Sequence, residues 1–162
     1  MISINVLDAG PLSLVTNPRG GEEAASCKEW LERMLASGAR VVVPGIADYE
    51  VRRELLRAGK TAGLSRLDLL IETLGYVPID QEVLRTAARL WSEARRRGKP
   101  TSPDLALDAD CILAAQARTA FKLLSHEQLI RGFAVRIVTK NRRHLDQFGP
   151  AEHWDKIPPD DP

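Results

Sequence analysis

The chain has 162 residues, of which 44% are hydrophobic and 28% charged, and its formal net charge is +1. This composition is ordinary for a globular protein and excludes a disordered or fibrous chain. A chain of this length supplies one hydrophobic core better than two. We therefore expect one domain over residues 1–155, followed by a flexible tail over residues 156–162.

No apolar run approaches the roughly 20 residues that a membrane-spanning helix needs. The N-terminus has neither the basic start nor the long apolar segment of a secretory signal. We therefore expect a cytoplasmic protein with no membrane partner. Cys27 and Cys111 lie in stretches with helical spacing, which indicates buried, reduced thiols and argues against a disulfide framework or a zinc site.

The first half of the chain alternates between strand and helix patterns. Residues 2–7 are apolar and β-branched, and Asp8-Ala9-Gly10-Pro11 predicts a turn that ends this strand. The pattern then predicts a helix over 21–37 with Leu35 on its apolar face, a buried strand over 40–43, helices over 46–58 and 63–74, and a strand over 76–79.

The second half continues the alternation. A helix is predicted over 81–97, with Leu84, Ala87, Ala88 and Trp91 facing inward. A loop over 99–107, a helix from near Asp108 through Ala120 with helical continuation to Ile130, a strand over 134–138 and a helical turn with Leu145 and Phe148 inward follow. Strands separated by helices predict an α/β fold, with a central, mainly parallel sheet flanked by helices on both faces.

Acidic and polar side chains follow the ends of the predicted strands. Asp8 comes directly after the first strand, Glu50 lies early in the helix after the second, and Thr139 and Asn141 follow the strand at 134–138. Asp110 begins a later helix. Because parallel sheets bind ligands outside the carboxyl ends of their strands, we expect these groups to meet at one edge.

Carboxylates that crowd together repel one another, so a stable fold must protonate them or supply a cation. A hard divalent cation such as Mg²⁺ or Mn²⁺ is the expected answer, because both prefer oxygen ligands. Mg²⁺ retains water, which can serve as the nucleophile in phosphodiester hydrolysis. The chain has no P-loop, HExxH or CxxC motif, which argues against ATP hydrolysis and zinc chemistry.

Four segments, taken in order, resemble the PIN-domain superfamily, and in particular the VapC-like toxin ribonucleases, over nearly the whole chain. They are Val6-Leu-Asp-Ala-Gly-Pro-Leu12, Val43-Pro-Gly-Ile-Ala-Asp-Tyr-Glu50, Asp110-Cys-Ile-Leu-Ala-Ala115 and Val138-Thr-Lys-Asn141. The resemblance implies a PIN-like fold and a metal-dependent endoribonuclease that is the toxin of a toxin–antitoxin pair. It also implies an RNA substrate, a homodimer and an antitoxin protein that holds the enzyme inactive.

Residue by residue, Asp8, Glu50 and Asp110 match the catalytic, metal-binding acids of that family. Each also has a plain structural alternative: Asp8 as a turn former or helix cap, and Glu50 as an exposed residue paired with Arg53. Glu54 lies one helical turn beyond Glu50 and is not included in the predicted site.

Asp108 is a further predicted metal ligand. It lies about 200° from Asp110 around a regular helix, so both can reach one cation only if Asp108 caps the helix. The alternative, given equal weight, is that Asp108 caps the helix and binds no metal. Asp104, after Pro103, is expected to be a loop residue.

The chain departs from the family after Asn141. Many relatives have an acid three residues further on, where this chain has His144, and Asp146 is a possible substitute. Imidazole is a poor Mg²⁺ ligand, so the second metal position is open. Thr139 and Asn141 are expected to contact phosphate or support the acids, and Arg52 and Arg142 are expected to hold the RNA backbone.

Two alternatives belong to other functional classes. A phospho-acceptor receiver domain would use Asp80 as the acceptor and Lys140 as the lysine near its last strand. Receivers have adjacent acids after the first strand, whereas Asp8 stands alone there. A PIN-like fold kept only for protein binding, with its nuclease activity lost, is left open by His144.

Overall fold

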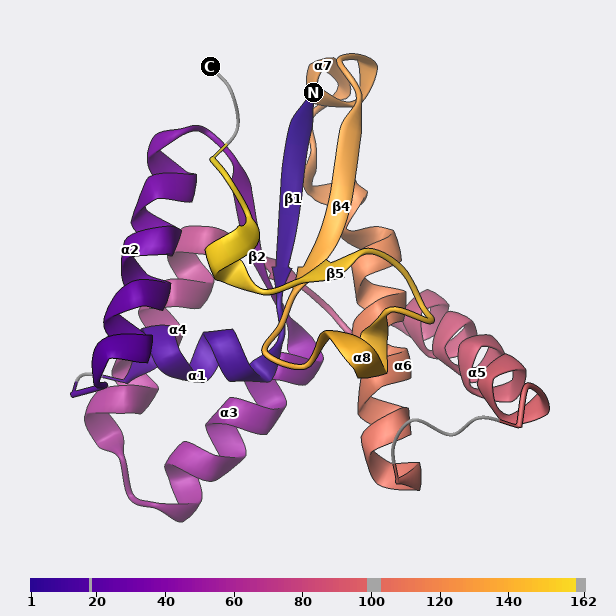
Figure 1. Ribbon diagram of the computed structural model, residues 1–162, viewed down its shortest axis with the longest axis horizontal. Coiled ribbons are helices and arrows are strands. Elements are labelled where there is room, and N and C mark those ends of the chain that lie inside the picture. The colour runs from indigo at the N-terminus through magenta and orange to yellow at the C-terminus, as the bar shows by residue number, and fades with distance from the viewer. Residues whose placement is uncertain (18, 99–102, 160–162) are drawn as a thin grey trace.

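The computed structural model describes residues 1–17, 19–98 and 103–159. Its centre is a five-stranded sheet in the order β3-β2-β1-β4-β5, and all four strand pairs of this sheet are parallel. Helices cover both faces of the sheet (Figure 1). The predicted α/β architecture is therefore confirmed.

The elements follow one another much as the hydrophobic pattern predicts. The strands are β1 (Ile2–Leu7), β2 (Arg40–Pro44), β3 (Tyr76–Val77), β4 (Phe133–Val138) and β5 (Ala151–Glu152). The α-helices are α1 (Ala9–Thr16), α2 (Glu22–Ala36), α3 (Gly45–Arg57), α4 (Thr61–Leu74), α5 (Gln81–Arg96), α6 (Asp104–Thr119), α7 (His126–Ile130) and α8 (Arg142–Leu145). Two 3₁₀ turns are η1 (Ala120–Leu123) and η2 (Trp154–Lys156).

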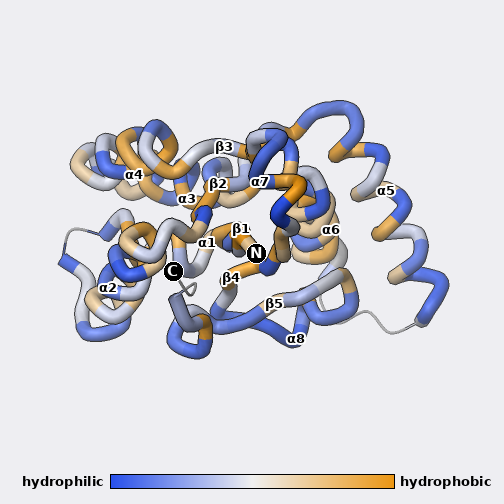
Figure 2. Tube along the Cα trace, turned by 90° about the horizontal axis from the view of Figure 1, so that it is seen from above, coloured by the Kyte–Doolittle hydropathy of each residue, from blue (hydrophilic) through white to orange (hydrophobic). Residues whose placement is uncertain are grey.

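The sheet separates two hydrophobic cores, because neighbouring residues of a strand point to opposite faces. Ile4 and Val6 of β1 belong to the core that α5 and α6 cover. Leu7 of β1 and Val41 and Val43 of β2 belong to the core that α1 to α4 cover. Figure 2 shows these two groups of helices on opposite sides of the strands. Both faces are therefore covered over the middle of the sheet, whereas the first four residues of β4 are exposed or only partly buried.

Strand β1 lies in the middle of the sheet, with β2 on one side and β4 on the other. Its pairing with β4 runs from Ile2 opposite Phe133 to Leu7 opposite Val138. The two strands therefore end level with each other. This register brings Asp8 beside Thr139, the residues that follow the two strands.

Helix α1 was not predicted, because Asp8-Ala9-Gly10-Pro11 has the composition of a turn. The structure starts a helix at Ala9, and the Asp8 side chain caps it by accepting a hydrogen bond from the Ala9 N–H. Pro11 is tolerated because it lies in the first helical turn, where its missing N–H has no partner within the helix.

Helix α6 begins at Asp104, not near Asp108, and its N-cap is Pro103. The expected loop over 99–107 is therefore wrong from Asp104 onward, and residues 99–102 lie outside the described part of the chain. The predicted helical continuation to Ile130 is also interrupted: η1 follows α6, and Ser125 then starts α7 with a capping box.

Of the residues predicted to face inward from α5, Ala87 is buried as expected, whereas Leu84, Ala88 and Trp91 are exposed. The structure buries Val83, Ala87, Leu90 and Ala94. Leu84 is 52% exposed and Trp91 37% exposed. Both stripes have helical spacing, so the spacing alone does not decide which of them is buried. Trp91 instead packs against Arg95, whose guanidinium carbon lies 5.0 Å from the centroid of the Trp91 ring.

Smaller differences concern chain ends and short elements. Leu35 of α2 is 43% exposed, β3 covers only the first half of the strand predicted over 76–79, and β5 was not predicted. Ile157 is buried in the core beside α2, so the packed part of the chain extends beyond the predicted boundary at residue 155. Residues 160–162 of the expected tail lie outside the described residues.

Within the described ranges, no helix combines the length and apolar character that crossing a bilayer requires. Cys27 and Cys111 are buried and free, as expected. Burial raises the pKa of both thiols to about 12, so neither is a reactive thiolate near neutral pH.

Gln116 of α6 joins three elements that position the carboxyl edge of the sheet. It is fully buried; its side-chain carbonyl accepts from the Ile46 N–H at 3.1 Å, and its amide donates to the Val77 carbonyl. The Ile46 N–H lies in the first turn of α3, where helix geometry supplies no partner. Gln116 therefore holds the start of α3 and the end of β3 against α6.

We predict that Gln116→Ala lowers the free energy of unfolding by about 2–6 kcal/mol, because two buried backbone groups lose their partners at about 1–3 kcal/mol each. Urea unfolding followed by circular dichroism measures the change. Gln81→Ala, at an exposed position at the start of α5, is the matched control and should change stability by less than about 0.5 kcal/mol. Equal midpoints for the two variants would contradict the role of Gln116.

Candidate functional site

Asp8 occupies the tip of the central strand and is held by three hydrogen bonds. Its N–H donates to the Val138 carbonyl at 2.9 Å. One carboxylate oxygen, Oδ1, accepts from the Ala9 N–H at 2.7 Å, and the other, Oδ2, accepts from the Thr139 hydroxyl at 2.7 Å. The carboxylate is therefore held in one orientation at the carboxyl edge of the sheet.

Thr139 is the support for that orientation. It is fully buried, and its hydroxyl accepts from the Asn141 N–H at 3.0 Å while donating to Asp8. The same hydroxyl thus links the tip of β1 to the segment after β4. The expectation that Thr139 supports the acids is consistent with these two contacts.

Glu50 lies in the second turn of α3, which begins directly after β2. The helix carries it to the edge of the sheet where β1 also ends. Burial raises the pKa of Glu50, and repulsion from Asp8 raises that pKa further, while Arg53 opposes the shift. Glu50 therefore lies within electrostatic range of Asp8.

Asp110 comes from α6, on the other face of the sheet. Burial, followed by repulsion from Asp8 and then from Glu50, raises its pKa to about 7. Its side chain is only 18% exposed, and its Oδ2 atom is buried with no hydrogen-bond partner among the described residues. An acid this poorly solvated is under-satisfied in its ionised form.

Asp8 responds to the same environment. Burial raises its pKa, and the hydrogen bonds from Thr139 and Ala9 and the charge of His144 act in the opposite direction. The pKa values of three carboxyl groups, one at the end of β1 and the others in α3 and α6, are thus raised, and repulsion among the groups contributes to the shifts of Glu50 and Asp110. Asp8, Glu50 and Asp110 are the acids that the sequence predicts to form the site, and that role stays a prediction.

These carboxyl groups suit a hard divalent cation in their chemistry. All three offer oxygen ligands, and the unpartnered Asp110 Oδ2 is an acceptor that a cation would satisfy. A cation would also offset the repulsion that raises the three pKa values. Over the described residues, however, no group of three or more His, Cys, Asp or Glu side chains is already arranged around one point as ligands. Metal binding therefore requires the side chains to move closer together.

Asp108 does not join this group. It is an exposed residue inside α6, and the cap of that helix is Pro103. Because shared ligation with Asp110 depended on Asp108 being the cap, the structure removes the reason for including it.

His144 and Asn141 lie at the rim of the site, after β4. The Nδ1 atom of His144 is 4.0 Å from Asp110 Oδ2, and its Nε2 atom is 3.4 Å from the Asn141 amide nitrogen. Asp146 points away into an ion pair with Arg142 at 3.0 Å. The side chain that faces the acids from α8 is therefore His144, not Asp146.

The two arginines expected to hold RNA are engaged elsewhere. Arg52 pairs with Asp48 at 2.9 Å and Asp68 at 2.7 Å. Arg142 pairs with Glu152 at 3.2 Å as well as with Asp146. Neither arginine is directed at the acids, and Arg53, on the next position of α3, is the cation that acts on Glu50.

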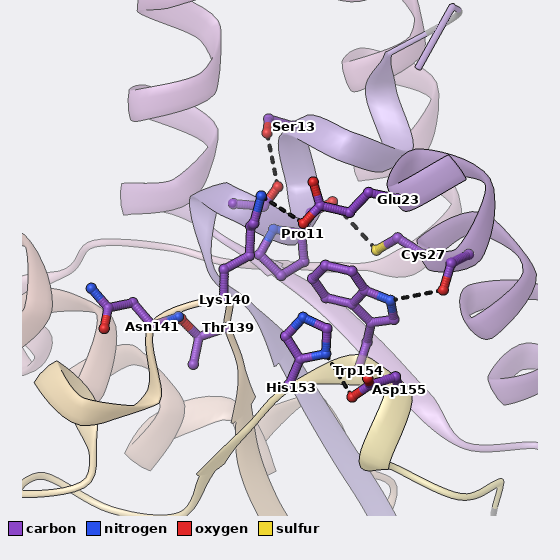
Figure 3. Close-up of polar contacts among 12 residues, drawn as sticks. Pro11, Ser13, Glu23, Cys27, Thr139, Lys140, Asn141, His153, Trp154 and Asp155 are labelled. Carbon is purple, nitrogen blue, oxygen red and sulfur yellow. Dashed lines mark hydrogen bonds and ion pairs between the residues drawn. The ribbon is translucent and has the colours of Figure 1, made fainter. Parts of the chain in front are cut away.

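Lys140 is a positioning residue that sequence reasoning did not place in the site. Figure 3 shows its side chain reaching across α1 to Glu23 of α2, with an ion pair of 2.7 Å. Its stem packs on Gly10, where an added Cβ would lie 3.1 Å from the Lys140 Cγ and Cδ atoms. The segment after Thr139 is thereby fastened to two helices. Nothing in the local sequence pairs Lys140 with Glu23, because the two residues are far apart along the chain.

The receiver interpretation is not supported by these contacts. Asp80 is the N-cap of α5 and accepts from the Val83 N–H at 2.9 Å. Lys140 is paired with Glu23. The two residues that a phospho-acceptor site would need are thus engaged in separate structural contacts.

Comparisons with known proteins concern the family and the fold. Residues 6–131 match the family model of the PIN domain. No curated protein sequence matches the chain.

Several solved structures share the fold. VapBC2 from Rickettsia felis, bound to a DNA fragment from its promoter, has 18% identity and a TM-score of 0.68. FitAcB from Neisseria gonorrhoeae has 17% identity and a TM-score of 0.64, and VapBC-1 from nontypeable Haemophilus influenzae has 16% identity and a TM-score of 0.61. Each match covers 94% of this chain and 99% of the other chain. At this level of identity the likeness concerns the fold.

The raised pKa of Asp110 predicts how the stability of the cation-free protein depends on pH. Between its unfolded value of 3.8 and about 7 the folded state keeps the proton that the unfolded state loses. Stability must therefore fall as pH rises through this window. Asp110→Asn has no such proton to lose. In EDTA it should be more stable than the original protein by a few kcal/mol at about pH 8, and the difference should vanish near pH 4.

Urea unfolding at a series of pH values measures this difference. Asp108→Asn, which changes an exposed carboxylate two residues away, is the matched control and should follow the original protein. If the free energies of unfolding of Asp110→Asn and of the original protein differ by the same amount at every pH, the pKa of Asp110 is not raised in the folded protein.

Thr139→Val tests the support of Asp8. The change keeps the shape of the side chain but removes the donor to Asp8 and the acceptor for Asn141. We expect the pKa of Asp8 to rise, because the hydrogen bond from Thr139 opposes that rise, and stability to fall by about 1–3 kcal/mol. Carboxyl NMR titration and urea unfolding measure the two effects. Thr139→Ser keeps the hydroxyl and should restore both values.

Proposed function

The chain belongs to the PIN-domain family, and on this basis we propose that it is a metal-dependent endoribonuclease. The observation that carries the proposal is the meeting of Asp8, Glu50 and Asp110, whose pKa values are raised by burial and mutual repulsion. Raised pKa values gathered at the edge of a parallel sheet are a mark of a functional site.

The three acids would hold Mg²⁺ or Mn²⁺. Such a cation, when bound, lowers the pKa of water and offsets charge that develops on the phosphate in hydrolysis. The unpartnered Asp110 Oδ2 supports this assignment, because it is a buried acceptor without a donor.

The residues of the chain itself would orient and bind. Thr139 holds the Asp8 carboxylate with one oxygen directed by its hydroxyl and the other by the Ala9 N–H. Asn141 and His144 lie at the rim, where an amide and an imidazole can donate to phosphate oxygens. A fixed arrangement of this kind lowers the cost of positioning a scissile phosphate.

We further propose that the protein is the toxin of a toxin–antitoxin pair. The support is the shared fold with chains from VapBC and FitAcB structures. An antitoxin protein is then the expected partner, and a homodimer the expected assembly. A cytoplasmic location suits an enzyme that meets RNA and carries two buried, free cysteines.

A second candidate is a PIN-domain protein that only binds other proteins. Two observations favour it: His144 stands where many relatives have an acid, and the described residues hold no ready-made group of three ligands. This candidate predicts neither cleavage nor cation binding.

The test is incubation of purified protein with total cellular RNA in Mn²⁺, Mg²⁺ or EDTA. We expect cleavage with either cation and none in EDTA. Asp8→Asn and Asp110→Asn should each lower the rate by about 100-fold or more, as loss of a group that stabilises the transition state commonly does. Asp108→Asn is the control and should cut like the original protein.

Thermal unfolding separates the two candidates. A cation that binds only the folded state must raise the midpoint. Intact RNA under all conditions, together with an unchanged midpoint on addition of Mn²⁺, would reject the nuclease and favour the protein-binding module.

A further inference from the structure

A groove of about 1120 Å³ opens beside Glu50. It is formed by α1 on one side and α3 on the other, and the start of α4 closes its far end. These three helices lie next to one another on the same side of the sheet (Figure 1). The groove is large enough for an extended chain of several linked groups, since pockets of this volume bury drug-sized ligands.

The groove is continuous with the acids. Ala9, which directly follows Asp8, lines its near end together with Glu50. From there the groove runs along α1 and along α3, and it reaches Asn17 and Gly59 just beyond the ends of these two helices. A polymer cleaved at the acids would thus find its next binding positions in this groove.

The charges of the groove are mostly positive away from the acids. Four cationic side chains line it: Arg19, Arg53, Arg57 and Lys60. Arg57 is neutralised by Glu54, which accepts two hydrogen bonds from its guanidinium. Over the described residues, no ion pair engages Arg19, Arg53 or Lys60. The Arg53 guanidinium lies 5.2 Å from the centroid of the Tyr49 ring and acts on the nearby Glu50, whereas the charges of Arg19 and Lys60 are available to an anion.

The remaining lining is apolar or small. Leu14, Val51 and Leu55 supply apolar surface between the two helices, and no aromatic side chain is among the described residues that line the groove. Base stacking on aromatic rings therefore contributes little here. An occupant would gain affinity from charge and from contact with sugar or base edges, without strong base selectivity.

We propose that this groove binds a single-stranded segment of the RNA substrate on one side of the cleavage point. Arg53 is the phosphate contact nearest the acids, and Arg19 and Lys60 are the contacts further out. A single strand fits better than a duplex, because double-stranded RNA is read across broad surfaces that span successive grooves. The inference rests on the proposed ribonuclease function and adds where and in what form the RNA binds.

The test measures binding of a short fluorescent single-stranded RNA of mixed sequence by anisotropy, over a series of salt concentrations. EDTA in the buffer prevents cleavage during the measurement. The groove variant combines Arg19→Gln and Lys60→Gln, which leaves Asp8, Glu50, Asp110 and Arg53 unchanged. The control combines Arg85→Gln and Arg96→Gln on α5, both exposed and outside the groove lining, with the same loss of charge.

Each phosphate contact to a single strand contributes about 0.7 to the slope of log K against log salt. We therefore expect the slope of the groove variant to fall by about 1.4, and its affinity near 0.1 M salt to fall by about 25-fold. The control variant should keep the slope and the affinity of the original protein. In the cleavage assay with Mn²⁺, the groove variant should show a raised KM and an unchanged kcat, because the lost contacts are made equally before and during reaction.

Two results would overturn the inference, and they differ in their meaning. If the original protein binds and cuts RNA while the groove and control variants behave alike, only this inference fails, and the groove is left to a protein partner. If the original protein neither binds nor cuts RNA, the proposed function fails together with it. Circular dichroism of each variant confirms that a loss of binding is not a loss of folding.

Discussion

The parallel pairing of β1 with both of its neighbours is the constraint on which the site depends. β1 and β4 end level with each other, so the Asp8 carboxylate meets the Thr139 hydroxyl at 2.7 Å. On the other side β2 ends beside β1 and leads directly into α3, which carries Glu50. Residues of β1 and β2 pack into the hydrophobic cores on both faces of the sheet, and this packing keeps the pairing in place. The fold therefore determines which acids meet before any ligand is present.

The same geometry makes the site energetically unfavourable while no ligand is bound to it. Burial and mutual repulsion raise the pKa values of Asp8, Glu50 and Asp110, and the buried oxygen of Asp110 has no hydrogen-bond partner among the described residues. Such a cost is tolerable only because hydrophobic burial on both faces of the sheet outweighs it. Raised carboxyl pKa values at one edge of a well-packed domain are typical of a functional site.

The local sequence was enough to predict most of the sheet, because the hydrophobic run of a strand is formed by residues that are close along the chain. Hydrophobic runs predict β1, β2 and β4, and Asp8 and Glu50 stand just after two of them. The inward face of α5 was wrong because Leu84 and Trp91 repeat at the same spacing as the true stripe. Long-range pairs were also beyond reach: neither Lys140 with Glu23 nor Gln116 with Val77 has any local signal. The groove could not be predicted either, because it depends on how α1 and α3 pack, and the start of α1 was predicted to be a turn.

The distribution of charge around the acids suits the binding of a polyanion that we propose for this nearly neutral chain. Arg52 and Arg142, which lie near the site in sequence, are paired with carboxylates outside it. Over the described residues, no arginine forms an ion pair with Asp110, so a small cation would not have to displace one. Arg19 and Lys60, which have no ion pair among the described residues, lie further out along the groove. Positive charge beside the acids and not among them would let the proposed site attract a divalent cation and a phosphate backbone at once, because each would find the opposite charge in a separate place.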